Sequence, residues 1–175
     1  SPSNKEGSAP TLGRNYEGGK VIEPKKGVYR NLMIVDAVSL YPSMAILHNI
    51  SFDTINCECC VKRKDAKVPA EVLDKGYWIC KQKGGAFPQK LREFRAERAR
   101  QKQLGNMVMQ QGLKILINGG YGLFGDSSFK YYDIRVAELI TAYGRYSLSK
   151  MQKIAESKGF EIVGGDTDSL FLLDV

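Results

Sequence analysis

Two turns, each following an apolar run, carry the acidic residues of this sequence with the clearest chemical potential. Asp36 follows the run 32–35, and Asp166 and Asp168 follow the run 162–165. Such runs predict buried strands, so each carboxylate would stand at a strand end. If these strands are neighbours, Asp36 and Asp168 converge and repel each other unless a divalent cation lies between them. Hard cations such as Mg²⁺ bind carboxylate oxygens and keep positions open for phosphate, which predicts a two-metal phosphoryl- or nucleotidyl-transfer site.

Basic residues on two expected helices are candidates for binding substrate phosphates. The helices are predicted over about 89–104 and 108–118, with a Gly-Asn turn between them. Arg98 and Lys114 each lie eight residues from Asn106, so an antiparallel hairpin places them level, about 12 Å from its tip. Two adjacent cations repel unless an anion lies between them, and a nucleoside triphosphate would satisfy both. The simpler alternative is a solvated basic face, because the first helix carries further cations: Arg92, Arg95, Arg100 and Lys102.

Other elements must position these residues. A strand is predicted from Gly27 to Asp36, followed by a short helix that begins near Pro42. The stretch 51–87 is polar and predicted to be largely irregular. A long helix is predicted from an Asp133 cap to about residue 158, with a glycine as its stop. Two strands, 160–163 and 170–173, would then flank the turn that contains Asp168.

The length of 175 residues allows one domain with a real core, or one domain with a small appendage. Hydrophobic residues make up 43% of the chain and charged residues 26%, which is ordinary for a globular protein. The net charge of +7 and the pI near 9.2 favour an acidic partner, and nucleic acid is the simplest candidate. No signal peptide and no apolar run of membrane-spanning length is visible, so we expect no membrane partner. The expected location is the cytoplasm, associated with the nucleoid, in an archaeon or bacterium, and the nucleus in a eukaryote.

Taken together, the motifs resemble those of the family B DNA polymerases, and most closely the archaeal type. Segment 36–43 resembles the family's motif A, 114–122 its motif B and 165–169 its motif C, in the family's order. Segment 16–19, Tyr-Glu-Gly-Gly, resembles a short motif just before the polymerase core. The resemblance covers nearly the whole chain from residue 16. A lone Asp-Thr-Asp turn would be weak evidence, whereas several motifs in order are specific.

The resemblance implies an α+β fold. A palm of antiparallel β-sheet backed by helices, with a ferredoxin-like core, would carry a short antiparallel helical fingers hairpin. The expected parts are a flexible segment 1–15, the first palm part with motif A over 16–87, a shortened fingers hairpin over 88–120, and the second palm part with motif C over 121–175. The family's exonuclease and thumb are absent from this sequence. We therefore expect a fragment or one subunit of a split enzyme, with weak or no processive synthesis on its own.

The resemblance also implies roles for individual residues. Asp36 and Asp168 would be the catalytic ligands of two Mg²⁺ ions, for which Mn²⁺ can substitute. The Ala37 carbonyl would complete the coordination shell of one ion. Asp166 would be an auxiliary catalytic carboxylate. Tyr41 would be the steric gate that leaves no room for a 2′-hydroxyl. The other nucleotide-binding residues would come from the motif A turn, the hairpin and motif B: Ser39, Leu40, Arg98, Lys102, Lys114, Asn118 and Tyr121. Three positions depart from the family pattern without removing a metal ligand or a phosphate cation: Ala37, Gly119 and Gly164.

The implied function is template-directed DNA synthesis, in which a primer 3′-hydroxyl attacks a deoxynucleoside triphosphate and pyrophosphate leaves. The implied partners are primer–template DNA, the dNTP, the missing thumb and exonuclease portions, and a sliding clamp that would bind outside this segment. Two alternatives stay open. One is an RNA-copying palm polymerase, against which Tyr41 argues. The other is a non-catalytic relative that binds nucleic acid or assembles a larger complex, against which the intact Asp36, Asp168, Arg98 and Lys114 argue.

The four cysteines allow three states. Cys57, Cys59 and Cys60 form a cluster that suggests zinc, but their spacing does not fit the common Cys-x₂-Cys pairs, and only Cys80 follows. The family resemblance suggests a Cys60–Cys80 disulfide, as in some archaeal members. Free thiols, that disulfide and a metal site therefore all remain open.

Overall fold

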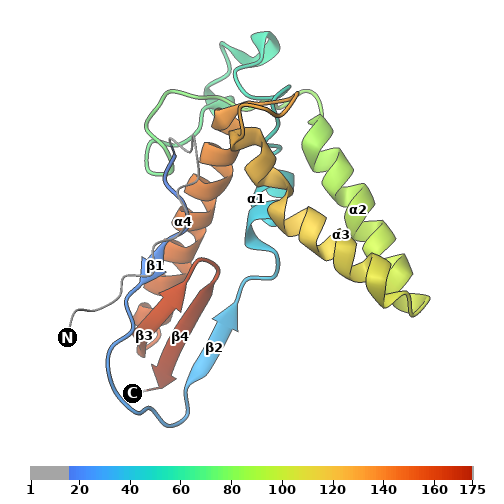
Figure 1. The fold of residues 1–175 in the computed structure, drawn as a ribbon. Coiled ribbons are helices and arrows are strands. Elements are labelled where there is room, and N and C mark those ends of the chain that lie inside the picture. The colour runs from blue at the N-terminus through green and yellow to red at the C-terminus, as the bar shows by residue number, and fades with distance from the viewer. Residues whose placement is uncertain (1–15, 175) are drawn as a thin grey trace, which may run out of the picture.

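The computed structural model describes residues 16–174, which form two arms joined at one end (Figure 1). One arm is an antiparallel β-sheet with a long helix against it, and the other is a helical hairpin. An irregular segment lies above the junction of the two arms. The predicted flexible segment 1–15 lies outside the described residues.

The sheet arm contains four antiparallel strands in the order β1-β3-β4-β2. Their bounds are Val21–Ile22 for β1, Met33–Asp36 for β2, Phe160–Asp166 for β3 and Ser169–Asp174 for β4. Helix α4, Ile134–Ser157, packs on the sheet through a small core in which Leu148, Ile162 and Leu170 are buried. This sheet brings Asp36, the end of β2 and the start of segment 36–43, next to segment 165–169 at the turn between β3 and β4.

The strands differ from their predicted bounds. β3 and β4 cover the predicted strands and extend beyond them, with a bulge in β3 between Ile162 and Gly164. β2 begins at Met33, so the predicted start at Gly27 is wrong. β1 was not predicted, because a two-residue strand carries no readable period and forms only by pairing with β3.

The hairpin arm contains α2, Ala86–Gln103, and α3, Met107–Gly119, which confirms the predicted pair of helices. α2 begins earlier than predicted because distant side chains cap it: the N–H groups of Ala86 and Phe87 donate to Asp53 and Ser51. Pro88 is tolerated there because the first-turn N–H groups have no intrahelical partner. At the tip, Gly105 has φ +72°, and Asn106 Oδ1 accepts a hydrogen bond from the N–H of Met109. A 3₁₀ helix, Gly120–Gly125 (η3), follows α3 directly.

The main core lies where the two arms meet. It packs helix α1, Leu40–Leu47, against the bases of α2 and α3 and the first half of α4, and its buried members include Leu40, Ala45, Ile50, Leu91, Ile117, Phe124, Val136, Leu139 and Ile140. The segment between α1 and α2 is irregular, as predicted, apart from two 3₁₀ turns, Glu58–Cys60 (η1) and Lys64–Ala66 (η2), and two isolated bridges.

Helix α4 agrees with its predicted ends. The Asp133 side chain accepts from the N–H of Arg135 at the start, and Gly159, with φ +88°, follows the last turn. Among residues 16–174, none of the helices combines the length and the apolar character needed to cross a bilayer.

Candidate active site

The two aspartates of the first prediction lie side by side in the sheet. Asp36 ends β2 and is paired with Ser169, the first residue of β4, so Asp168, in the turn just before β4, lies beside Asp36. The N–H of Ala37 donates to the carbonyl of Asp168 at 2.8 Å, which joins the two turns. Burial, and then the negative charge of Asp36, raise the pKa of Asp168. Two neighbouring carboxylates form a site suited to a hard cation, because both offer oxygen ligands.

The turn between β3 and β4 is held in an unusual conformation. Thr167 has φ +50°, a left-handed region that β-branched residues rarely occupy. Its N–H donates to the Lys20 carbonyl at 2.9 Å, and its hydroxyl donates to the Asp166 carboxylate at 2.9 Å. Asp166 is exposed at the end of β3 and is engaged with Thr167, whereas Asp168 turns into the cavity described next. The auxiliary catalytic role expected for Asp166 stays a prediction.

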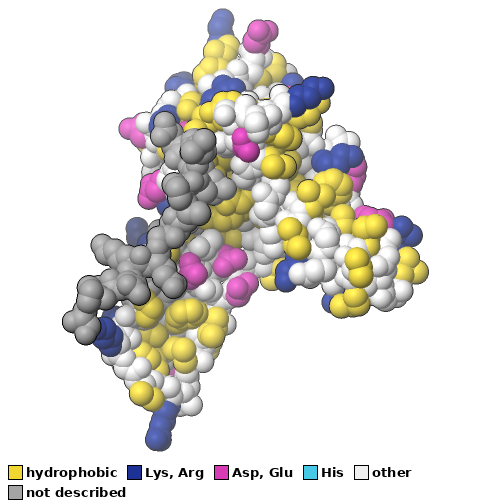
Figure 2. Space-filling view, viewed as in Figure 1, with side chains coloured by type: hydrophobic (Ala, Val, Ile, Leu, Met, Phe, Trp, Pro, Cys, Tyr) yellow, Lys and Arg dark blue, Asp and Glu magenta, His cyan; other side chains and the backbone are white. Residues whose placement is uncertain are grey.

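A cavity of about 400 Å³ connects the aspartates with the hairpin. Its lining comes from β2, the β3–β4 turn, α1, α2 and α3, and includes Asp36, Ser39, Leu40, Tyr41, Arg98, Lys114, Asn118 and Asp168. Most of the predicted metal and nucleotide residues are therefore brought together. Figure 2 shows acidic side chains gathered in the hollow between the arms, with basic side chains on the facing side of the hairpin.

Four predicted residues lie outside this lining. Ala37 follows Asp36 directly, and Asp166 lies in the adjacent turn. Tyr121 packs against Tyr41 at the cavity wall, with 4.8 Å between ring centroids. Lys102 lines a neighbouring cavity of about 390 Å³, which shares Val38, Ser39 and Arg98 with the first. The two hollows are therefore contiguous through Ser39 and Arg98.

The first turn of α1 faces the cavity. Ser39, the N-cap, has φ 51° and ψ 55°, and its side chain makes no cap hydrogen bond. The first N–H groups of a helix have no intrahelical partner and carry the positive end of the helix dipole. The backbone of Ser39, Leu40 and Tyr41 is therefore suited to an anionic ligand.

The Tyr41 side chain packs closely against two glycines, Gly19 and Gly144. A Cβ on Gly144 would lie 2.8 Å from a carbon of the Tyr41 ring, and a Cβ on Gly19 would lie 2.6 Å from its hydroxyl oxygen. Burial, and then Tyr121, raise the pKa of Tyr41 to about 12, so the phenol stays protonated at neutral pH. Gly19, Gly144 and Tyr121 therefore hold the Tyr41 side chain in place in the wall of the cavity that also contains the two aspartates.

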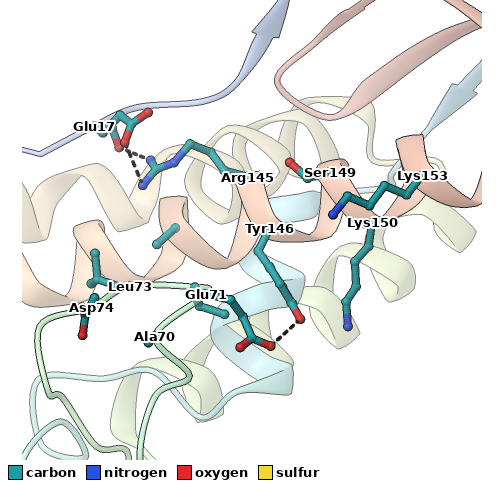
Figure 3. Close-up of a pocket in the computed structure, with 12 residues that line it drawn as sticks. Glu17, Ala70, Glu71, Leu73, Asp74, Arg145, Tyr146, Ser149, Lys150 and Lys153 are labelled. Carbon is teal, nitrogen blue, oxygen red and sulfur yellow. Dashed lines mark hydrogen bonds and ion pairs between the residues drawn. The ribbon is translucent and has the colours of Figure 1, made fainter.

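Hydrogen bonds join the Tyr-Glu-Gly-Gly segment, residues 16–19, to α4. Arg145 Nη1 donates to the carbonyl oxygens of Glu17 and Gly18 at 2.6 and 2.7 Å, and the Thr141 hydroxyl donates to the Glu17 carbonyl at 2.9 Å. Figure 3 shows Glu17 and Arg145 at the edge of a separate cavity of about 650 Å³ along α4, which contains neither Asp36 nor Asp168. These hydrogen bonds place Gly19 against Tyr41 and the Lys20 carbonyl within hydrogen-bonding distance of the Thr167 N–H. The segment therefore contacts both the turn after Asp36 and the turn that contains Asp168.

One residue of the hairpin was missed by the sequence reasoning. Arg95 Nη2 donates to the Ser43 hydroxyl at 2.8 Å, and Arg95 lines the second cavity with Arg98 and Lys102. Burial lowers the pKa of Arg95, an arginine that nevertheless stays charged. Its spacing of three residues from Arg98 and seven from Lys102 places all three on one helix face, which is the signal that would have identified it.

The cysteines are free thiols in the structure. The Sγ atoms of Cys60 and Cys80 are 3.9 Å apart, so the structure contains no Cys60–Cys80 disulfide. All four thiols lie together in the irregular segment, away from the aspartates.

Known proteins resemble this chain in both sequence and structure. The sequence model for DNA polymerase family B matches residues 2–173. DNA polymerase 1 of Sulfolobus acidocaldarius is 37% identical over 91% of this chain and 20% of that protein, and the DNA polymerase of Archaeoglobus fulgidus is 37% identical over 93% and 21%. The solved family B DNA polymerase of Pyrobaculum calidifontis matches with a TM-score of 0.65 and 27% identity, over 93% of this chain and 23% of that one. The chain spans about a fifth of the length of the curated relatives it matches.

Proposed function

Because this chain belongs to DNA polymerase family B, we propose that it forms the nucleotide-binding catalytic centre of a DNA-directed DNA polymerase. The observation that supports this most is the composition of one cavity, which has Asp36 and Asp168 on one wall and Arg98 and Lys114 on another. Carboxylates that bind metal and cations that bind phosphate are the two requirements of nucleotidyl transfer. In this proposal the sheet, α1 and α4 are the palm, and α2 with α3 is the fingers hairpin.

The residues beside the sheet fit a divalent cation. Asp36, Asp168 and the Ala37 carbonyl offer oxygen ligands, which Mg²⁺ and Mn²⁺ prefer over nitrogen or sulfur. The raised pKa of Asp168 reflects burial and an uncompensated neighbouring charge, which a bound cation would offset. When bound, two such ions would supply activation of the primer 3′-hydroxyl and neutralisation of the departing pyrophosphate.

The other residues bind and orient the substrate. Arg98 grips phosphate oxygens bidentately, Lys114 adds a point charge, and Asn118 offers a hydrogen-bonding amide one turn further along α3. The N–H groups of Ser39, Leu40 and Tyr41 bind the triphosphate tail at the start of α1. Primer–template DNA would supply the complementary base and the attacking hydroxyl.

The first experiment measures metal-dependent nucleotide binding to the 175-residue chain. Mn²⁺ binding is followed by electron paramagnetic resonance with and without dATP. The wild type should bind Mn²⁺ and dATP together, and Asp36→Asn and Asp168→Asn should weaken that joint binding by at least tenfold, or about 1.4 kcal/mol. Asp174→Asn removes an exposed carboxylate at the far end of β4 and should leave it unchanged. Joint binding that survives both Asp36→Asn and Asp168→Asn contradicts the proposal.

The phosphate side of the cavity is tested in the same assay. Arg98→Ala and Lys114→Ala should each weaken dATP binding while leaving Mn²⁺ binding alone unchanged. Arg100→Ala is the matched control, because Arg100 is exposed on the same helix and paired with Glu97. Equal losses in Arg98→Ala and Arg100→Ala would mean that only the general charge of α2 matters.

The sugar side is tested through Tyr41. Tyr41→Ala should increase binding of ATP relative to dATP, because a smaller side chain leaves room for the 2′-hydroxyl. A wild-type chain that already binds ATP as well as dATP would instead favour the RNA-synthesising alternative.

A further inference from the structure

Four cysteine sulfurs converge in the irregular segment between α1 and α2. Cys59 and Cys60 lie in the η1 turn, Cys57 is its N-cap, and the fourth is Cys80. Cys59 Sγ lies 3.5 Å from Cys57 Sγ, 3.8 Å from Cys60 Sγ and 3.5 Å from Cys80 Sγ, and Cys60 Sγ lies 3.9 Å from Cys80 Sγ. All four sulfurs lie within 4.8 Å of one another. Each of the four sulfurs is therefore close to the other three.

The four separations between 3.5 and 3.9 Å match those expected around one tetrahedral ion, and the other two pairs lie within 4.8 Å. A zinc–sulfur bond is about 2.3 Å long, so two sulfurs on the same tetrahedral ion are about 3.8 Å apart. We propose that Cys57, Cys59, Cys60 and Cys80 bind a single tetrahedral metal ion, with zinc as its expected identity. A multi-iron cluster would separate its cysteine ligands further, because iron and sulfide atoms lie between them. A single iron ion shares the same thiolate chemistry, and the experiment below distinguishes the two.

The surroundings of the sulfurs suit thiolate ligands. The N–H of Lys81 donates to Cys60 Sγ at 3.5 Å, and the N–H of Gln82 donates to Cys80 Sγ at 3.4 Å. Such donors stabilise negative sulfur and orient the ligands of a metal. Four thiolates and one divalent ion carry a net charge of −2, and the flanking sequence is rich in compensating cations: Lys62, Arg63, Lys64, Lys81 and Lys83.

The fold holds the ligands in place independently of any metal. The Ile55–Ile79 bridge and the hydrogen bond from the N–H of Cys80 to the Thr54 carbonyl bring Cys80 to the η1 turn. Trp78 Nε1 donates to the Cys57 carbonyl at 2.8 Å, and the Trp78 ring packs against the buried cysteines. Cys60 and Cys80 are 0% and 2% exposed, so water has little access to two of the four sulfurs.

The proposed ion would brace the base of the hairpin. Asn49 Nδ2 donates to the carbonyl oxygens of Cys80 and Lys83, and Asn49 Oδ1 accepts from the N–H of Gly85, the N-cap of α2. The segment 80–83, which contains the ligand Cys80, is therefore linked through Asn49 to α2, the helix that carries Arg98. A bound metal ion contributes most to the stability of a segment that has little regular structure of its own.

Metal content of the full chain, purified under reducing and anaerobic conditions, tests the proposal directly. Mass spectrometry of the metals should find one equivalent of zinc per chain after gel filtration, and one equivalent of iron instead would assign the same site to iron. Cys59→Ser should lower the metal affinity at least tenfold, and Glu58→Gln, an exposed neighbour within η1 that offers no thiol, should retain it. Chelation should change the emission of Trp78, the chain's only tryptophan, and lower the melting temperature.

Cobalt provides a second readout that does not depend on stability. Co²⁺ bound to four thiolates gives the intense visible absorption of a tetrahedral site, and that absorption should weaken in Cys59→Ser but not in Glu58→Gln. The proposal fails if the reduced chain retains no metal while all four thiols react freely. It also fails if mass spectrometry finds a Cys60–Cys80 disulfide in the chain purified without reductant and no metal in the reduced chain.

Discussion

At the scale of single residues, burial and the charge of Asp36 both raise the pKa of Asp168. Burial is the larger cause of the raised pKa of Asp168, and the Asp36 carboxylate is the next. Asp36→Asn removes that charge, so the pKa of Asp168 should fall toward its ordinary value. A ¹³C NMR titration of the Asp168 carboxyl group measures the change, and Asp174→Asn serves as the control. A pKa that stays the same in Asp36→Asn would show that the charge of Asp36 is not a cause of the raised pKa.

The same raised pKa gives stability a defined pH dependence. The folded chain holds the Asp168 proton more tightly than the unfolded chain does. The resulting stabilisation is therefore fully present below the ordinary aspartate pKa and is lost as pH rises through the raised folded pKa. Asp168→Asn should flatten the metal-free free energy of unfolding across that window, as measured by urea denaturation at several pH values. An unchanged slope in the variant would contradict the assignment. Mn²⁺ affinity should rise over the same window, because the ligand must lose its proton.

At the scale of elements, two helical glycines should respond oppositely to alanine. Alanine is favoured over glycine in a helix interior by about 1 kcal/mol. A Cβ at Gly112 of α3 would meet open space, so Gly112→Ala should stabilise the chain by nearly that amount. A Cβ at Gly144 of α4 would lie 2.8 Å from the Tyr41 ring, and overpacking costs about 1–3 kcal/mol. Gly144→Ala should therefore give no gain or a loss in urea unfolding. Equal stabilisation by both variants would mean that Tyr41 is not held by contact with α4.

The tip of the hairpin depends on its cap. Asn106 Oδ1 accepts from the N–H of Met109, and replacing such a cap with alanine costs about 1 kcal/mol. The apolar side chains at the tip are exposed, among them Val108 at 86%, so the loss should appear as local fraying. Hydrogen exchange of the amides at 107–110 should be faster in Asn106→Ala, while the amides of α4 keep their protection. Gln103→Ala, an exposed change at the end of α2, should not accelerate exchange there.

The helices could be read from the sequence far better than the small elements. The hairpin and α4 carry long periodic patterns with their own end signals, Gly105–Asn106 and Asp133, and the structure agrees with them. The start of α2 could not be predicted, because its caps, Ser51 and Asp53, come from another segment. The thiol cluster was hidden for the same reason: pairing across Ile55 and Ile79, and not local spacing, brings Cys80 to the others. The aspartates were found because each stands beside its own apolar run.

At the scale of the whole molecule, the net charge of +7 should govern DNA binding. If the chain binds primer–template DNA through phosphates, the logarithm of the association constant should fall linearly with the logarithm of salt concentration, by about 0.9 for each phosphate neutralised on duplex DNA. Fluorescence anisotropy from about 50 to 200 mM salt measures that slope. Arg95→Ala should reduce it if the second cavity contacts DNA. Affinity that does not change with salt would contradict a phosphate-based interface.

The sheet order has a consequence for how the protein is made. Within residues 16–174, β2 pairs with β4 alone, and β4 follows β2 only after the helical hairpin, α4 and β3. On a ribosome, β2 therefore emerges on the order of ten seconds before its partner. During that wait Met33–Val35 form an unpaired apolar strand, the kind of edge that invites aggregation in a nascent chain. The acidic pair is assembled only when translation has passed β4, so the nucleotide binding proposed for this cavity would have to wait until β4 has folded.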